Sequence, residues 1–345
     1  MKNRVCRLYG QNDLRVENDN VPKPGPEEVL VKVAYGGVCG SDMHYFYHGG
    51  IGEIRVQEPI ILGHEFSGTV FAIGEEVVQV KAGEHIAINP SRPCGACSFC
   101  AQGLNHHCLT MRFSGSAMYF PHEQGGFRDF IVVHQSQCII VDKKIPLSQI
   151  ACSEPLSVGL HALSQAGGVE GKKVFVSGVG PIGSLCVAAL KNAGATEVVA
   201  IDVNDMRLKI AKKMGADKVL NAKNDSDALN KYTENKGYFD LSFECSGASV
   251  AIETALRVIK PKGTLVQVGV SGRADIPLGM IVGKEINFVG SHRFHSEFVE
   301  AAHLISSGAI DVSPILTSFY PAESALEAIR IASEGADNVK VQLTF

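Results

Sequence analysis

The sequence predicts an α/β protein of two domains, a β-rich domain followed by a doubly wound parallel sheet. Three observations lead to this fold class. The chain has 345 residues, more than the roughly 250–300 residues over which a single core keeps growing. Its first 150 residues alternate short β-rich runs with glycine and proline, and from residue 151 apolar strands alternate with helical periods. These rhythms are typical of an irregular antiparallel domain and of repeated β-α units, respectively.

Each expected element is bounded by turn residues. In the first half the strands lie in the runs 27–37, 66–74, 83–90 and 127–141. In the second half they lie in the runs 174–177, 198–203, 238–247, 263–272 and 285–291, with a helix over 249–260. A helical stretch over 296–308 and a terminal strand over 339–345 follow. The pattern alone leaves open which domain these last sixty residues join.

Composition narrows the class of partner. The chain carries 32 Lys and Arg against 36 Asp and Glu, a net charge of −4, without blocks of like charge. This balance argues against nucleic acid and anionic membranes as partners. The N-terminus lacks the apolar core of a signal peptide, and no apolar run reaches about 18 residues. Ten cysteines in such a chain are expected to be thiols in a reducing compartment, so we expect a cytoplasmic protein.

A glycine-rich turn predicts a dinucleotide site. The run GVGPIG, Gly178–Gly183, follows the strand VFVS and opens a helix, and Asp202 ends the next strand. Gly178, Gly180 and Gly183 allow a tight turn and close approach of a pyrophosphate to the helix N-terminus, near which Pro181 costs little. Asp202 favours the ribose of NAD over the phosphate of NADP, although Arg207 weakens that discrimination. The alternative is a turn that binds no nucleotide.

Four cysteines predict a closed metal site. Cys94, Cys97, Cys100 and Cys108 have the spacing C-x2-C-x2-C-x7-C. Four thiolates satisfy tetrahedral zinc and leave no position for substrate, so we expect a structural zinc. His106 or His107 could replace Cys108, an iron–sulfur cluster could use the same ligands, and four unligated thiols are a further alternative.

A second constellation predicts an open metal site. Cys39 and His64 lie in glycine-rich turns, and Glu154 starts the second half. Three protein ligands leave one position for substrate, as catalytic zinc requires. Glu65 is either a ligand or an outer carboxylate, and Asp42 is placed to orient the imidazole of His64. A buried cysteine and a turn histidine without metal are the alternative.

These motifs occur together in one order: GHE-x2-G-x5-G over Gly63–Gly74, the four-cysteine loop, SEPL and GVGPIG. Along its whole length the chain resembles the zinc-dependent medium-chain alcohol dehydrogenases, and CGSDMHY, HGGIGE and SHRF resemble their polyol dehydrogenase branch. The resemblance implies a GroES-like catalytic domain over 1–150 and a Rossmann domain over 151–285. It also implies that the segment 286–345 returns to the catalytic domain.

The resemblance also implies residue roles. Cys39, His64, Glu65 and Glu154 match the catalytic zinc site, and the four-cysteine loop matches the structural zinc. Ser41, His44 and Glu154 match catalytic positions, the first two of them in a proton relay. Substrate contacts match Tyr45, Glu154 and Arg293. Apart from the resemblance, a sugar-acid carboxylate needs a cationic contact, for which Arg293 is one candidate and Arg112 a weaker one because a loop arginine is more often solvated. Cofactor contacts match Gly178, Gly180, Pro181, Ile182, Gly183, Asp202, Arg207, Val268, Gly269, Val270, His292, Arg293 and Phe294.

The implied activity is zinc-dependent transfer of hydride from a secondary alcohol to NAD, with NADP as an alternative. The expected substrate is an open-chain sugar acid, L-idonate, which would give 5-keto-D-gluconate. A polyol such as sorbitol, xylitol or galactitol is the alternative substrate. Two zinc ions per chain and a homodimer or homotetramer are expected. A different class, a non-catalytic zinc-ribbon or structural protein on a dehydrogenase fold, stays open. The absence of Lys and Arg between Cys94 and Cys108 argues against a ribbon that binds nucleic acid.

Overall fold

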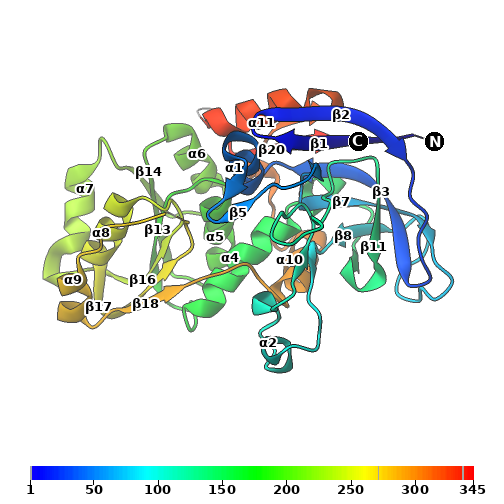
Figure 1. Cartoon of the computed structure of the whole chain (residues 1–345). Coiled ribbons are helices and arrows are strands. Elements are labelled where there is room, and N and C mark those ends of the chain that lie inside the picture. The colour runs from blue at the N-terminus through cyan, green and yellow to red at the C-terminus, as the bar shows by residue number, and fades with distance from the viewer. Residues whose placement is uncertain (1, 271, 336–337) are drawn as a thin grey trace. The chain divides into compact units, whose positions relative to one another are not determined.

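The computed structural model describes residues 2–270, 272–335 and 338–345, which form two compact units (Figure 1). Unit 1 comprises Met1–Glu154, Phe298–Gly308 and Leu316–Phe345. Unit 2 comprises Pro155–Glu297 and Ala309–Ile315. The predicted α/β fold class, with a mostly antiparallel sheet and a separate parallel sheet, is confirmed.

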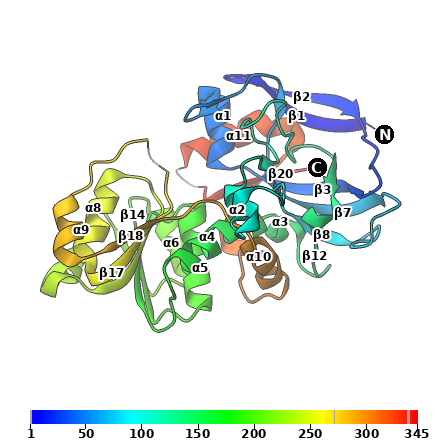
Figure 2. The same cartoon turned by 60° about the horizontal axis from the view of Figure 1, so that its bottom comes forward.

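Unit 1 is built on one large sheet with the strand order β12-β8-β7-β3-β20-β19, and β11 pairs with β3 as well (Figure 2). Its strands are β3 (Glu28–Gly37), β7 (Glu65–Ile73), β8 (His85–Ile88), β11 (Phe130–His134), β12 (Cys138–Ile140), β19 (Leu316–Pro321) and β20 (Lys340–Thr344). The last strand, β20, pairs antiparallel with β3, so the end of the chain completes the sheet that the N-terminal part begins.

Smaller elements surround this sheet. The other strands are β1 (Lys2–Gly10), β2 (Asp13–Asn20), β4 (Gly50–Ile51), β5 (Ile54–Arg55), β6 (Ile60–Ile61), β9 (Ser91–Arg92) and β10 (Arg112–Phe113). The helices are α1 (Gly40–His48), α2 (Ser98–Ala101), α3 (Leu147–Ile150), α10 (Glu297–Ser306) and α11 (Ala325–Glu334). Helix α4 (Ser153–Gln165) begins at the last two residues of the N-terminal part of unit 1.

Alternation along the strands explains the core of unit 1. Val29, Val31 and Val33 of β3 are buried and pack with Phe66 and Val70 of β7. A second cluster joins β1, α1 and α11 through fully buried residues such as Leu8, Phe46 and Ile329. Strands place their apolar side chains on one face and helices place theirs along one side, so these elements bury two apolar clusters in unit 1.

Unit 2 is a parallel sheet with the strand order β15-β14-β13-β16-β17-β18. Its strands are β13 (Lys173–Ser177), β14 (Glu197–Asp202), β15 (Lys218–Asn221), β16 (Phe239–Glu244), β17 (Ile259–Gln267) and β18 (Asn287–Gly290). Its helices are α5 (Pro181–Asn192), α6 (Asp205–Lys213), α7 (Ser226–Asn230), α8 (Ser249–Val258) and α9 (Leu278–Lys284).

The strand order of unit 2 reverses between β13 and β16. This is the doubly wound order of dinucleotide-binding sheets, in which ligands bind at the carboxyl ends of the strands where the order reverses. The strands are buried on both faces: Val174, Phe175 and Val176 of β13 are fully buried. Strand β18 pairs with β17, so the sheet extends to Gly290, beyond residue 285.

Short 3-10 helices connect several elements, at Asn105–His107, Gln135–Gln137, Lys231–Lys236, Ser313–Ile315 and Ala322–Ser324. No helix within the described residues is both long and apolar enough to cross a membrane.

Candidate functional site

The open metal site is assembled by the sheet of unit 1. Cys39 follows the end of β3, and His64 and Glu65 stand at the start of β7. Gly37 of β3 is the register partner of Glu65, so hydrogen bonding between these neighbouring strands brings the two turns together. The ligand atoms of Cys39, His64 and Glu65 all lie within 4.8 Å of one another. The structure therefore brings together three of the four residues predicted for this site.

The turn before His64 depends on glycine. Gly63 has a φ of 97°, and a Cβ there would lie 2.3 Å from the ring of Phe127. An alanine at this position would therefore be strained and would collide with a fully buried ring. The turn holds His64, which is 6 % exposed, against the sheet.

Asp42, which was predicted to orient the imidazole of His64, hydrogen-bonds to both turns. Its carboxylate accepts hydrogen bonds from the backbone N–H of Cys39 at 2.9 Å and of Gly63 at 3.1 Å. One of its oxygens lies 3.9 Å from Nδ1 of His64. Burial raises the pKa of Asp42 although His64 and the two N–H groups lower it. Asp42 thus links the backbone of Cys39 and that of Gly63, the residue before His64, to one buried carboxylate.

A lysine that the sequence did not reveal completes the surroundings of Glu65. Nζ of Lys340, the first residue of β20, donates to the two carboxylate oxygens of Glu65 at 2.8 and 2.7 Å and to the carbonyl of Val38 at 3.2 Å. Both side chains are 2 % exposed. Burial lowers the pKa of Lys340, but the Glu65 carboxylate raises it, and the net shift is upward. The lysine thus supplies a positive partner for a carboxylate that is buried beside two other potential metal ligands.

Glu154 is the fourth predicted residue. It lies in the first turn of α4 and is 7 % exposed. Burial raises its pKa to about 8, with His64 lowering it and Glu65 and Cys39 raising it. Glu154 is therefore electrostatically coupled to the site, although its carboxylate does not belong to the group of ligand atoms within 4.8 Å.

Helix α1 carries the other residues expected near this site. Ser41 is half-buried and His44 is exposed, and they stand three residues apart on the helix. Tyr45 is 3 % exposed, and its hydroxyl oxygen accepts a hydrogen bond from the N–H of Ala117 at 3.1 Å. Its role as a substrate contact stays a prediction. Arg112, the second candidate cation, is engaged by the carboxylate of Glu123.

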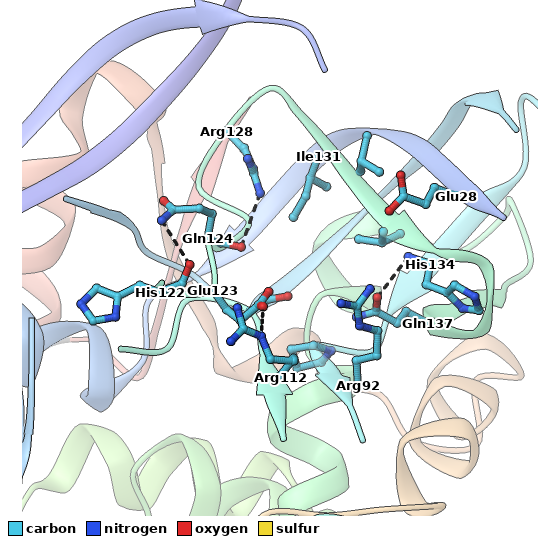
Figure 3. Close-up of a pocket in the computed structure, with 14 residues that line it drawn as sticks. Glu28, Arg92, Arg112, His122, Glu123, Gln124, Arg128, Ile131, His134 and Gln137 are labelled. Carbon is cyan, nitrogen blue, oxygen red and sulfur yellow. Dashed lines mark hydrogen bonds and ion pairs between the residues drawn. The ribbon is translucent and has the colours of Figure 1, made fainter. Parts of the chain in front are cut away.

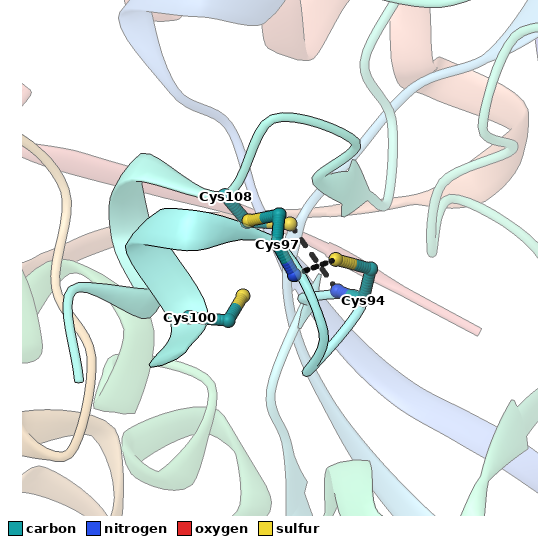
Figure 4. Close-up of side chains that lie close together, drawn as sticks. All are labelled: Cys94, Cys97, Cys100 and Cys108. Carbon is teal, nitrogen blue, oxygen red and sulfur yellow. Dashed lines mark hydrogen bonds between the residues drawn. The ribbon is translucent and has the colours of Figure 1, made fainter. Parts of the chain in front are cut away.

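The four-cysteine loop converges as its spacing predicts (Figure 4). The four Sγ atoms lie within 4.8 Å of one another. The N–H of Cys94 donates to Sγ of Cys108 at 3.2 Å, and the N–H of Cys97 donates to Sγ of Cys94 at 3.4 Å. Hydrogen bonds, first from the N–H of Ala96, lower the pKa of Cys94 to about 6. Converging thiolates with N–H donors fit tetrahedral zinc.

The glycine-rich turn of unit 2 has the geometry expected for a dinucleotide. Gly178 has a φ of 81°, and a Cβ there would lie 2.7 Å from Cβ of Ser246. A Cβ on Gly183 would lie 1.9 Å from the carbonyl oxygen of Gly178. By contrast, nothing lies within 4 Å of a Cβ on Gly180, the residue that caps α5. The helix N-terminus is therefore open to a phosphate group.

The other predicted cofactor residues lie around the ends of these strands. Asp202 ends β14 and accepts from the N–H of Val179 at 2.8 Å and of Asn204 at 3.0 Å. Its carboxylate retains acceptor capacity for a ribose. Val270, after β17, is 94 % exposed, whereas Phe294 is 1 % exposed. Arg293 has a positive φ of 55°. Pro181, Ile182 and Arg207 lie on α5 and α6, and Val268, Gly269 and His292 follow β17 and β18.

A buried acid, Glu244, was not predicted and links these turns. At the end of β16 and 0 % exposed, it accepts from the N–H of Ser246 at 2.7 Å, the N–H of Gly247 at 2.9 Å and Nε2 of Gln267 at 2.6 Å. Its carbonyl accepts from the N–H of Gly269 at 2.8 Å. Since Ser246 touches Gly178, one side chain connects the glycine turn with the ends of β16 and β17.

Two families match the sequence. The family described as Alcohol dehydrogenase GroES-like domain matches residues 25–143. The family described as Zinc-binding dehydrogenase matches residues 181–307. The first match covers Cys39, His64 and the four-cysteine loop, and the second begins inside the glycine turn, at Pro181, and covers Asp202.

Individual relatives match over the full length. The chain is 41% identical to an L-idonate 5-dehydrogenase (NAD(P)(+)) of Escherichia coli K12, over 100% of this chain and 99% of the relative. The crystal structure of the L-idonate 5-dehydrogenase from E. coli K-12 has a TM-score of 0.96 and covers 100% of this chain and 99% of its own. Sorbitol dehydrogenase of Gallus gallus is 35% identical over 99% of this chain and 96% of its own. A zinc-binding dehydrogenase of Sinorhizobium meliloti bound to NADP is 28% identical, with a TM-score of 0.90 and 100% coverage of both chains.

Proposed function

Because the chain belongs to the zinc-binding dehydrogenase family and carries its alcohol dehydrogenase GroES-like domain, we propose that it oxidises L-idonate to 5-keto-D-gluconate with NAD. The observation that carries the reaction type is the buried group of Cys39, His64 and Glu65. The substrate rests on the E. coli relative, which is 41% identical over the full length.

We assign Cys39, His64 and Glu65 as ligands of a catalytic zinc. A thiolate, an imidazole and a carboxylate within 4.8 Å of one another suit zinc and leave a fourth position for substrate. Glu154, buried beside them, is assigned as the acid that faces this open position. The four-cysteine loop is assigned a second, structural zinc because its thiolates close the coordination shell.

When both are bound, zinc supplies a Lewis acid that lowers the pKa of the substrate hydroxyl, and NAD supplies the acceptor for the hydride. The chain's own residues then remove a proton. Oγ of Ser41, half-buried on α1, is assigned to accept the hydroxyl proton and to pass it to the imidazole of His44. The exposure of the two residues supports this order, because Ser41 is half-buried whereas His44, three residues farther along the helix, is exposed to solvent.

Unit 2 is assigned the cofactor. Gly180 and the N-terminus of α5 would receive the pyrophosphate, and Asp202 would accept from the adenosine ribose. The carboxylate of Asp202 supports a preference for NAD, because it would repel the phosphate of NADP. Arg207 on α6 is assigned to the adenine side, with Val268–Val270 and His292–Phe294 as further contacts. Arg293 is assigned to the carboxylate of the sugar acid, a role that Arg112 is less suited to because Glu123 engages it.

A substrate panel tests this proposal. The purified protein is given L-idonate, sorbitol, xylitol and galactitol, each with NAD and with NADP, and NADH or NADPH is followed by absorbance. We expect kcat/KM for L-idonate with NAD to exceed that for sorbitol by at least about tenfold. Equal or better turnover of sorbitol or xylitol would establish a polyol dehydrogenase instead. No reduced cofactor across the panel would indicate a non-catalytic protein, and faster reaction with NADP would refute the role of Asp202.

Assembly and location complete the proposal. We propose a homodimer or homotetramer, because β18 is an edge strand and the nearby side chains Leu278, Val282 and Phe288 are exposed. We propose a cytoplasmic location, because all ten cysteines are free thiols, several of them placed as metal ligands. The partners are then zinc, NAD and a small sugar acid.

A further inference from the structure

A polar cavity of about 250 Å³ lies in unit 1 (Figure 3). Strands β9, β10 and β11 and the loop before β11 line it. Its basic side chains are Arg92, Arg112, Arg128, His122 and His134. None of the residues assigned to zinc or to the cofactor lines it among the described residues. The cavity is therefore a candidate site that the dehydrogenase reaction does not use.

The side chain of Arg128 in this cavity lacks a hydrogen-bond partner for one of its nitrogens in the described structure. Its Nε is buried and has no hydrogen-bond partner among the described residues, while a terminal nitrogen donates to the carbonyl of Gln124 at a long 3.4 Å. No ion pair of Arg128 occurs among the described residues. Burial lowers its pKa to about 10. Arg128 is half-buried, but a guanidinium N–H that is buried without an acceptor or a counter-charge is costly, and such an unsatisfied donor favours a bound group.

The neighbouring acids are engaged elsewhere. Glu123 forms an ion pair with Arg112. Asp19 lies near enough to raise the pKa of Arg128, but its ion pair is with Arg7. Glu28, across the cavity, accepts from the N–H of Gly25 at 2.8 Å. Asp19 and Glu123 thus act on Arg128 only from a distance, and no carboxylate forms an ion pair with it within the part of the chain that the structure describes.

Two further arginines face each other on the opposite wall. Arg92 of β9 and Arg112 of β10 are register partners in an antiparallel ladder. Like charges directly opposite in a ladder repel. Glu123 compensates Arg112, whereas Arg92 has no ion pair among the described residues. Both ring nitrogens of His122 already have partners in the protein. Nε2 accepts from the N–H of Gln57, and Nδ1 lies at hydrogen-bonding distance from the carbonyl oxygen of Tyr119.

We propose that this cavity binds a small multivalent oxyanion, inorganic phosphate or the phosphate group of a small metabolite, between Arg128 and the Arg92–Arg112 pair. Guanidinium groups recognise phosphate through paired, charge-assisted hydrogen bonds. A cavity of about 250 Å³ has room for such an ion, since one water occupies about 30 Å³ of liquid. Bound phosphate would supply the acceptor that Nε of Arg128 lacks and would reduce the repulsion between the strands.

Calorimetric titration of the zinc-loaded enzyme with inorganic phosphate tests the proposal, with chloride keeping the ionic strength constant. We expect saturable binding of one phosphate per chain. At a phosphate concentration of ten times Kd, the equilibrium constant for unfolding should fall about elevenfold. Glucose 6-phosphate forms a second arm, and tighter binding than phosphate would identify a phosphorylated metabolite as the source of the anion.

Three variants complete the design. Arg128→Gln should weaken phosphate binding at least about tenfold, and Arg128→Lys should restore part of it. Arg92→Gln, at an exposed position that leaves the fold intact, should weaken binding about threefold. Arg15→Gln is the matched control, because Arg15 pairs with Asp13 on an exposed hairpin, and its phosphate binding should equal that of wild type.

Two outcomes would overturn the proposal. One is a wild-type titration without saturable heat or stabilisation by either phosphate ligand. The other is phosphate binding that survives in both Arg92→Gln and Arg128→Gln. If phosphate does not bind and both arginine variants instead lower the mass of the particle in solution, an acidic side chain of a second copy fills the cavity.

Discussion

The two cysteine-containing metal sites of unit 1 differ in how the chain builds them. The closed site takes Cys94, Cys97, Cys100 and Cys108 from one surface loop, where backbone N–H groups donate to the sulfurs. The open site takes Cys39, His64 and Glu65 from two turns that are adjacent only because β3 and β7 pair, and a buried lysine holds its carboxylate.

This difference separates the two expected roles. A loop whose folding depends on its metal can supply all four ligands from one short segment, because metal binding itself orders that segment. A reaction site must leave one position open, so the protein has to hold the remaining ligands rigidly without help from a fourth. The sheet, Asp42 and Lys340 provide that rigidity at the open site.

The largest effect is expected from Cys39→Ser. It removes the thiolate of the open site and should lower kcat by more than about a hundredfold, because even outer-shell changes cost about 10–100-fold. Metal analysis should still find one zinc per chain, held by the four-cysteine loop. Full activity in this variant would exclude Cys39 from the reaction centre, and loss of both metals would show that the two sites are not independent.

Lys340→Met comes next. It leaves the carboxylate of Glu65 buried without its cation, which should lower the free energy of unfolding by about 3–5 kcal/mol. The zinc content of the open site should fall while that of the loop is retained. The control is Lys260→Met, which breaks an exposed pair with Asp240 and should cost less than about 1 kcal/mol. Equal losses in the two variants, measured by denaturant titration, would contradict the role of Lys340.

A smaller effect is expected from Cys97→Ser, which should lose stability but keep its activity. Removing one of four ligands should lower the free energy of unfolding by at least about 2 kcal/mol through loss of a structural metal. The kcat of the folded fraction should stay within about threefold of wild type. Ser98→Ala, next to it on the exposed loop, should change stability by less than about 0.5 kcal/mol. A stable variant whose chemical step is abolished would reverse the assignment of the two sites.

The smallest effect is expected in unit 2, where Glu244 lacks any partner cation among the described residues and is held by N–H donors. In Glu244→Gln an amide NH2 group would face those donors, so the turns that meet at the glycine loop should loosen. We expect the Kd for NADH to rise about tenfold, or about 1.4 kcal/mol, with an unchanged KM for the sugar acid. A fall in melting temperature with an unaltered Kd would assign Glu244 to stability alone.

Sequence patterns were sufficient where the chemistry is local. The four-cysteine loop and the turn Gly178–Gly183 are each contained in one short segment, and the structure has both as predicted. The fold class was predictable for the same reason, because period-two runs and β-α rhythm are local properties.

The residues of the open metal site are brought together by the register of strand pairing, which cannot be read from the spacing of residues in the sequence. Cys39 and His64 lie 25 residues apart in sequence, and their convergence comes from the pairing of β3 with β7. The sequence alone did not distinguish Lys340 from a surface lysine. In the structure, β20 is buried on both faces, and Lys340 is buried like its neighbours Val341, Gln342 and Leu343. Glu244 did carry a signal: like Asp202, it is an acid that ends an apolar strand beside the nucleotide turns.

The position of β20 has a consequence for the order of events during synthesis. Strand β3 is translated early, but its neighbour β20 lies about 300 residues later and carries Lys340. Closing so long a loop makes this pairing a slow, non-local step. All six strands of the unit 2 sheet precede β20 in the chain, so that sheet can form first. The Glu65–Lys340 pair beside the open metal site therefore forms only after β20 has been synthesised, long after Cys39 and His64.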